Sequence, residues 1–254
     1  ADPILVHPDV RRMLLTQKAF LEGGRVMTYF AAQLSDIAQR GSGDDRASAE
    51  RLLDLMTPIV KGFVTETAFE AVNHALQIHG GHGFIRETGV EQLVRDARIT
   101  LIYEGTTQIQ ALDLLGRKVV MNQGKALMSF IEMIRAEADL QSGGPFASRL
   151  RELADQWGEL ALGLGGKAMG DVDEIGAASV DFLMYSGYAT MAYFWARIAR
   201  VASAHEDDAF MRGKVKTAQF FFDRILPRAN AHHRAALSGA DSLMDVSANE
   251  FGHH

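Results

Sequence analysis

The stretch VEQLVRDARITLIYEGTTQIQ, residues 90–110, places two helical patterns on either side of a glycine turn. Before the turn, apolar side chains recur three and four residues apart, at Leu93, Val94, Ala97, Leu101 and Ile102. A strand would alternate apolar and polar residues instead, so this spacing predicts a helix. We expect the turn at Gly105 and a cap on the next helix from Thr106 or Thr107, whose hydroxyl can accept an orphan backbone N–H.

The same helical spacing continues through almost the whole chain. The expected helices cover about residues 9–37, 48–79, 90–102, 107–119, 125–140, 146–170, 174–204 and 207–237. Pro58 should bend or break the second helix, because a proline inside a helix removes a backbone hydrogen bond. Alternating strand patterns are missing, so we predict an all-α fold. It would form two packed helical units, residues 1–122 and 123–251, while residues 252–254 resemble the remnant of a purification tag.

The composition excludes several classes of function. The 254 residues are 47% hydrophobic and 23% charged, with a net charge of −6 and no cysteine. Lysine and arginine form no separate basic block, so we expect neither a nucleic-acid partner nor a membrane-surface partner. Without cysteine there is no disulfide, no thiolate nucleophile and no cysteine-held metal, which favours a cytoplasmic location. Residues 1–14 also lack the pattern of a signal peptide.

The most apolar segment of the chain is Phe182–Ala196. It is shorter than the roughly 20 residues that a membrane-spanning helix needs, so we expect a buried helix. Its nearly all-round apolar surface must be covered, as must the triplet Phe220–Phe222. We expect part of that surface to be an interface with other domains.

Glu104 is the first candidate for chemistry. It lies at the turn, beside Ile102, Tyr103 and the apolar helix that carries Ile109. Such neighbours should partly remove its carboxylate from water, which would raise its pKa toward the range of a general base. The alternative is an ordinary surface turn, because perturbed carboxylates are often merely structural.

The segment QIHGGHGF, residues 77–84, is the second candidate. Gly80 and Gly81 follow a helix, where glycine permits a positive φ and lets another molecule approach the backbone. Free N–H groups in such a turn suit phosphate oxygens, although a plain helix end is the commoner use of glycine. His79 and His82 lack a local set of carboxylate ligands, so we predict no metal site.

Three other patterns favour structural roles. GLGGKAMG, residues 163–170, loosely resembles a dinucleotide fingerprint, but the preceding residues are helical, so close helix packing is favoured. His232 and His233 should lie on a solvated helix face. The charges of RDAR, residues 95–98, should form ion pairs on a helix surface.

Taken together, QIHGGHGFIRETGVEQLVRDARITLIYEGTTQIQ, residues 77–110, resembles the C-terminal helical domain of the FAD-dependent acyl-CoA dehydrogenases. The glutamine with its double glycine, the Arg-Asp-Ala-Arg segment and the Tyr-Glu-Gly-Thr turn match that family in order and spacing. The similarity covers about residues 5–120. The N-terminal helix and the long tail resemble the larger subgroup, which includes dehydrogenases of 3-methylmercaptopropionyl-CoA and of a broad range of long-chain acyl-CoAs.

The resemblance implies a four-helix-bundle domain followed by an extra helical domain, and it implies a role for the turn. Glu104 would be the base that removes the pro-R α-proton of an acyl-CoA thioester, while the β-hydride passes to flavin N5 and the trans-2-enoyl-CoA forms. The backbone N–H of Glu104 would donate to the thioester carbonyl. Gly105 would let the substrate lie close.

The resemblance also implies a cofactor and partners. Thr106 and Gln108 would contact FAD, and Gln77, Gly80 and Gly81 would meet the adenosine diphosphate part of the FAD held by the neighbouring subunit. A homo-oligomer follows, and the tail favours a dimer. Electron-transfer flavoprotein would receive the electrons.

One departure from the family pattern is large. The N-terminal helical domain and the middle β-domain, which cover the other side of the flavin, are not in this sequence. We therefore expect a C-terminal fragment that is inactive alone. The alternative is a non-catalytic helical docking or oligomerisation module that keeps the motif as scaffold.

Overall fold

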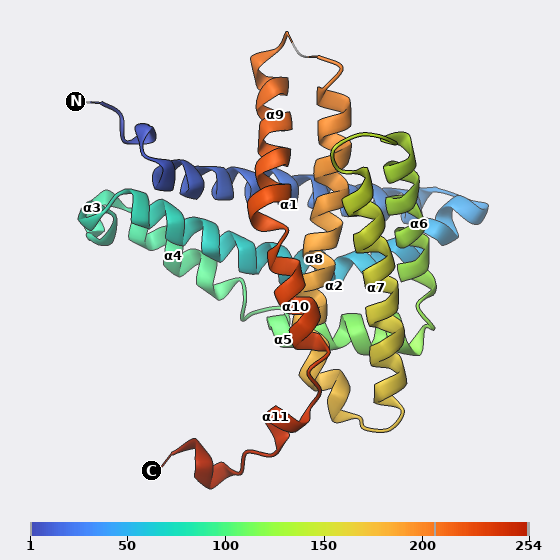
Figure 1. Ribbon diagram of the computed structural model, residues 1–254. Coiled ribbons are helices and arrows are strands. Elements are labelled where there is room, and N and C mark those ends of the chain that lie inside the picture. Colours follow the sequence, from blue (N-terminus) through green and yellow to red (C-terminus); the bar gives the residue numbers. More distant parts are fainter. Residues whose placement is uncertain (1, 206, 253–254) are drawn as a thin grey trace.

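Two long antiparallel helices, α1 (Pro8–Arg40) and α2 (Gly43–Ile78), form the base of the molecule. They lie side by side across Figure 1, and a short helical turn, η1 (Ile4–Val6), precedes them. The computed structural model describes residues 2–205 and 207–252. No strand occurs within these two ranges, so the predicted all-α class is confirmed.

The chain then returns along α2. The returning elements are α3 (Gly81–Phe84), η2 (Arg86–Thr88), α4 (Val90–Ile99) and α5 (Thr107–Leu112). Helix α5 continues without a break into a π-helical segment, η3 (Asp113–Met121). Figure 1 shows α3 and α4 at one end of α2, with α5 nearer its middle.

The remaining helices stack on this base. They are α6 (Lys125–Leu140), α7 (Ala147–Ala168), α8 (Asp173–Ala202), α9 (Ala209–Phe220), the π-helical η4 (Phe221–Ile225) and α10 (Arg228–Ala236). Two short turns, α11 (Asp241–Met244) and η5 (Ala248–Phe251), end the described chain. The tag remnant expected at 252–254 lies outside the described residues except for Gly252.

Helix α8 is the centre of the fold. It contacts α1, α2, α5, α7, α9 and α10, and almost every residue between Phe182 and Ala196 is buried. Trp195 donates to the carbonyl of Ala19 on α1 at 3.2 Å. The chain's own helices therefore cover this apolar surface, so the expected interface at Phe182–Ala196 is wrong. Phe221 and Phe222 are likewise buried within the chain, and Phe220 is partly buried.

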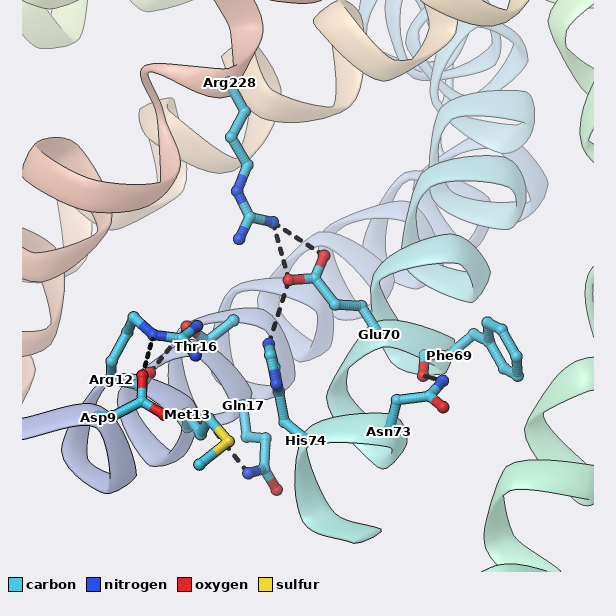
Figure 2. A network of polar contacts seen from close by, with 10 residues as sticks. All are labelled: Asp9, Arg12, Met13, Thr16, Gln17, Phe69, Glu70, Asn73, His74 and Arg228. Carbon is cyan, nitrogen blue, oxygen red and sulfur yellow. Dashed lines mark hydrogen bonds and ion pairs between the residues drawn. The ribbon is translucent and has the colours of Figure 1, made fainter. Parts of the chain in front are cut away.

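Ion pairs also join the two predicted units. Figure 2 shows Arg228 of α10 donating to both carboxylate oxygens of Glu70 on α2, at 2.9 and 2.8 Å. His74 Nε2 lies 3.4 Å from the same carboxylate. Buried apolar residues from both units belong to one contiguous cluster. The division at residue 122 stays a prediction.

Several predicted helix bounds need correction. The second helix begins at Gly43 rather than near residue 48, and it continues through Pro58. The helix predicted over 207–237 is three pieces, because the chain widens into the π-helical η4 and Pro227 then precedes α10. The Leu226 N–H donates to the Phe221 carbonyl, five residues back, so the α-helical ladder is interrupted here.

The structure also differs from two predictions made from the sequence. Residues 163–168 lie within α7 as predicted, but a methyl group added at Gly163 or Gly166 would meet no atom within 4 Å. Close packing does not explain these glycines. His232 is not on a solvated face, because α10 packs on α8. Nδ1 of the His232 ring lies 2.7 Å from Oδ1 of Asp181. His233 is also only partly exposed, with its ring against Tyr185.

Candidate functional site

The turn between α4 and α5 carries Glu104 in an unusual backbone conformation. Its φ is 54°, and that of Gly105 is 90°. Within the described residues, Gln123 is the one other non-glycine residue with positive φ. Left-handed angles are uncommon for residues with a Cβ and cluster at functional sites, where surrounding contacts hold them.

Side chains of helix α2 hold this turn in place. The ammonium of Lys61 donates to the carbonyls of Thr100 and Gly105, at 2.9 and 2.5 Å. Five residues along α2, the Glu66 carboxylate accepts a hydrogen bond from the Thr107 hydroxyl at 2.5 Å. The turn is therefore fixed before and after Glu104.

Two further contacts complete the turn. Thr106 caps α5 by accepting from the N–H of Ile109 at 3.3 Å, so the predicted cap is confirmed at the first of its two candidates. Gln110 donates from its amide to the carbonyl of Glu104 at 3.2 Å. The N–H of Glu104 itself donates to no acceptor within the described chain.

The Glu104 side chain is exposed, which corrects the expected desolvation. The turn lies at the surface, and no described element covers it. Its neighbours are exposed apolar groups: the exposed fractions are 49% for Ile102, 49% for Tyr103 and 55% for Ile109. A carboxylate within exposed apolar surface could be removed from water only by another molecule or domain.

The glycine segment after α2 is also open. Gly80 has φ 58° and ψ −143°, and a methyl group added at Gly80 or Gly81 would meet no atom within 4 Å. Both glycines and the Gln77 side chain are exposed. The backbone here can be approached closely, as a phosphate-bearing ligand requires.

The histidines on either side of the two glycines lie at the end of α2 and in α3. His79 uses Nδ1 against the carbonyl of Ala75 at 2.8 Å. No group of three or more potential ligands gathers anywhere in residues 2–205 and 207–252.

The predicted site residues fall into two groups. The first comprises Glu104, Gly105, Thr106 and Gln108, all in or directly after one turn, and the second comprises Gln77, Gly80 and Gly81. On α2, Lys61 contacts the first group through the Gly105 carbonyl, and Gln77 of the second group lies sixteen residues further along the same helix. At about 1.5 Å per residue, the two groups are roughly 24 Å apart along the axis. The chain does not bring them together.

The charges of RDAR decorate the surface of α4. Arg95 pairs with Glu91 at 3.1 Å, and Asp96 accepts from Gln92 at 2.8 Å. Arg98 lies over the ring of Phe69, 5.8 Å from its centroid. Only the first of these contacts is an ion pair, so the expectation holds for Arg95 alone.

Sequence reasoning missed Lys61 and Glu66. Both lie in a regular helical pattern, and their partners follow 39 to 44 residues later. No local spacing marks such contacts.

Two family models together match most of the chain. Residues 1–119 match the family model "Acyl-CoA dehydrogenase, C-terminal domain", and residues 129–247 match "Acetyl-CoA dehydrogenase C-terminal like". The chain belongs to the acyl-CoA dehydrogenase family. The first model includes both groups of predicted site residues.

Curated relatives support the same assignment. The chain is 42% identical to 3-methylmercaptopropionyl-CoA dehydrogenase of Ruegeria pomeroyi, over 97% of this chain and 44% of the relative. It is 37% identical to the broad-specificity linear acyl-CoA dehydrogenase FadE5 of Mycobacterium tuberculosis, over 96% of this chain and 43% of the relative. The chain thus spans less than half the length of these acyl-CoA dehydrogenases.

A solved structure supports the fold. The chain resembles Caenorhabditis elegans ACDH-11 in complex with C11-CoA, with a TM-score of 0.56 and 19% identity. The match covers 80% of this chain and 34% of the other. In the part of the chain that the structure describes, no helix is long and apolar enough to cross a membrane.

Proposed function

We propose that this chain supplies the catalytic base and part of the flavin site for the α,β-dehydrogenation of an acyl-CoA thioester to the trans-2-enoyl-CoA. The observation that carries the proposal is the Glu104 turn. Glu104 has a positive φ, and a hydrogen bond from Lys61 of α2 holds its turn in place. Its side chain lies among exposed apolar residues that other domains could cover.

In this mechanism Glu104 breaks the Cα–H bond of the thioester. The proton moves to its carboxylate, and the electron pair remains on the substrate. A weakly acidic α-proton needs a positioned base and a polarised carbonyl. The free N–H of Glu104 would donate to that carbonyl, and this hydrogen bond strengthens as enolate charge develops.

The residues present fit a flavin. FAD, when bound, would accept the β-hydride of the substrate. Thr106 and Gln108 would contact it beside the base, whereas Gln77, Gly80 and Gly81 would hold the adenosine diphosphate part of a second FAD, belonging to the neighbouring subunit. Their roughly 24 Å separation along α2 supports assigning the two groups to different flavins. The open backbone at Gly80 supports the phosphate role.

Partners follow from the same proposal. We infer a homodimer in the cytoplasm that passes electrons to electron-transfer flavoprotein. The two relatives suggest 3-methylmercaptopropionyl-CoA and linear acyl-CoAs as the first substrates to assay. Flavin bleaching by each thioester would rank them.

The test is Glu104→Gln in the full-length protein. We expect FAD to stay bound while the rate of flavin reduction by acyl-CoA falls by about 10³-fold or more, because an amide cannot accept the α-proton. Glu159→Gln, at an exposed glutamate on α7, is the matched control and should reduce normally. Retained turnover in Glu104→Gln would refute the proposal. Purification of the wild-type protein without flavin affinity would favour the docking module instead.

A further inference from the structure

Lys61 is half-buried in the middle of α2, and its ammonium faces backbone rather than an acidic side chain. Its two contacts are the carbonyls of Thr100 and Gly105, at 2.9 and 2.5 Å. Hydrogen bonds from a charged donor are about twice as strong as those between neutral groups. The lysine thus joins the residue after α4 to the residue after Glu104.

No carboxylate of the described residues forms an ion pair with this ammonium. None of the ion pairs found in residues 2–205 and 207–252 includes Lys61. The lysines at 18, 118, 167 and 214, in contrast, all pair with an acidic residue. A partly buried ammonium held only by two carbonyl dipoles leaves positive potential at the turn. Such potential favours negative charge that develops nearby.

The position of the two carbonyls makes the contact specific to the turn. Thr100 lies four residues before Glu104, and Gly105 follows it directly. The left-handed angle at Glu104 is strained for a residue with a Cβ and persists only where neighbours fix it. Loss of the ammonium would free both carbonyls to turn toward water, and the direction of the Glu104 side chain would no longer be set.

We propose that Lys61 is a positioning residue that holds the Glu104 turn in its reactive geometry. This inference rests on the proposed function of Glu104. Lys61 touches neither the substrate nor the flavin in this scheme. It acts through the peptide groups on either side of the base.

The first arm of the test is amide hydrogen exchange in the full-length protein. Lys61→Met is nearly the same length but lacks the charge. We expect exchange of the hydrogen-bonded amides of residues 100–103 to accelerate by at least about tenfold, with exchange in α7 and α8 unchanged. Lys118→Met is the matched control, because Lys118 is also half-buried, but its ammonium pairs with a carboxylate, that of Asp54 on α2. It should leave the turn protected.

The second arm measures flavin reduction. In Lys61→Met, the rate constant at saturating acyl-CoA should fall on the order of 10²-fold, while KM changes by less than about threefold. Lys61→Arg keeps the charge and should recover about tenfold of this loss. If Lys61→Met gives no soluble protein, Lys61→Gln, whose amide can donate to one carbonyl, takes its place with both readouts.

These outcomes distinguish the role of Lys61 from the proposed function of Glu104. If Lys61→Met behaves like Lys118→Met in either arm, the inference is overturned, even when Glu104→Gln is inactive. Faster exchange with normal reduction also overturns it, because Lys61 would then only stabilise the fold. If Glu104→Gln retains turnover, the proposed function fails and Lys61 loses its role in positioning a base.

Discussion

At the scale of single residues, Glu104 and Gly80 both have positive φ, at 54° and 58°. They differ in how the chain supports them. Glu104 is held by contacts from α2 and α5. Gly80 needs no such support, because a residue without a Cβ adopts these angles freely, and its ψ of −143° lies in a region that is essentially restricted to glycine.

Gly80→Ala should therefore destabilise the protein by about 1–3 kcal/mol, although the added methyl group meets no other atom. Gly81→Ala is the control, since that residue is equally open but has no positive φ. It should change the free energy of unfolding by less than about 0.5 kcal/mol. Urea unfolding measures both variants. Equal losses would show that φ is not the cause.

The sequence predicts the parts of the site that depend on local chemistry. A threonine before an amphipathic helix indicates a cap, and Thr106 is one. Glycines after a helix indicate an open turn, as found at Gly80. Lys61 could not be predicted, because its contacts depend on how α4 and α5 return along α2. The exposure of Glu104 could not be predicted either, because a local sequence pattern does not show which apolar neighbours remain exposed.

At the scale of helices, α8 and α2 approach each other closely. A methyl group added at Gly187 would come within 2.1 Å of the Phe63 ring, which itself packs edge-on against Tyr188 at 4.9 Å between centroids. A side chain at residue 187 would force the two helices apart. The glycine therefore belongs to the packing of the core.

Gly187→Ala should destabilise the protein by about 1–3 kcal/mol, as overpacked cores do. Gly163→Ala, in the open on α7, tests the same chemical change without a neighbour. It should stabilise the protein by about 0.5–1 kcal/mol, because alanine is the better helix former. Thermal and urea unfolding should move in opposite directions for the two variants. A loss in Gly163→Ala would contradict the packing explanation.

Helix α8 also carries two tyrosines whose phenols are buried. Burial raises the pKa of Tyr185 and that of Tyr188 above the ordinary value of 10.0. In the unfolded chain both phenols lose their protons near pH 10, while the folded protein retains them. The unfolded state then binds fewer protons, so the free energy of unfolding should fall as the pH rises above about 10.

The maximum slope is about 1.4 kcal/mol per pH unit for each tyrosine. Urea unfolding between about pH 9 and pH 11 measures it. Tyr185→Phe should lower stability at neutral pH, because it removes the hydrogen bond to the Leu153 carbonyl at 3.2 Å, but it should flatten the alkaline loss. An unchanged slope would show that this phenol ionises normally in the folded protein.

At the scale of the whole molecule, helical periodicity predicted the class of fold and most of the helices. It failed where periodicity continues through a change of helix type, as in the segment of η4 and Pro227. It also could not show that α8 would be covered on all sides by the chain's own helices. That depends on tertiary packing, which a periodic pattern does not specify.

The shared core predicts one cooperative unfolding transition. The two tryptophans report on different places, because Trp157 lies on α7 and Trp195 contacts α1. Single-tryptophan variants, Trp157→Phe and Trp195→Phe, should each give fluorescence and circular-dichroism transitions with the same midpoint. Separate fluorescence and circular-dichroism midpoints would contradict a single cooperative transition.

Helix α2 joins the two groups of site residues through a stiff backbone, and this limits how its length can change. Inserting one residue between Lys61 and Gln77 would rotate everything beyond it by about 100° and shift it by about 1.5 Å. The glycine segment at residues 80 and 81 would then no longer keep its orientation relative to the Glu104 turn. Natural variants of this segment should therefore differ by substitution, whereas single-residue insertions and deletions would be eliminated by selection.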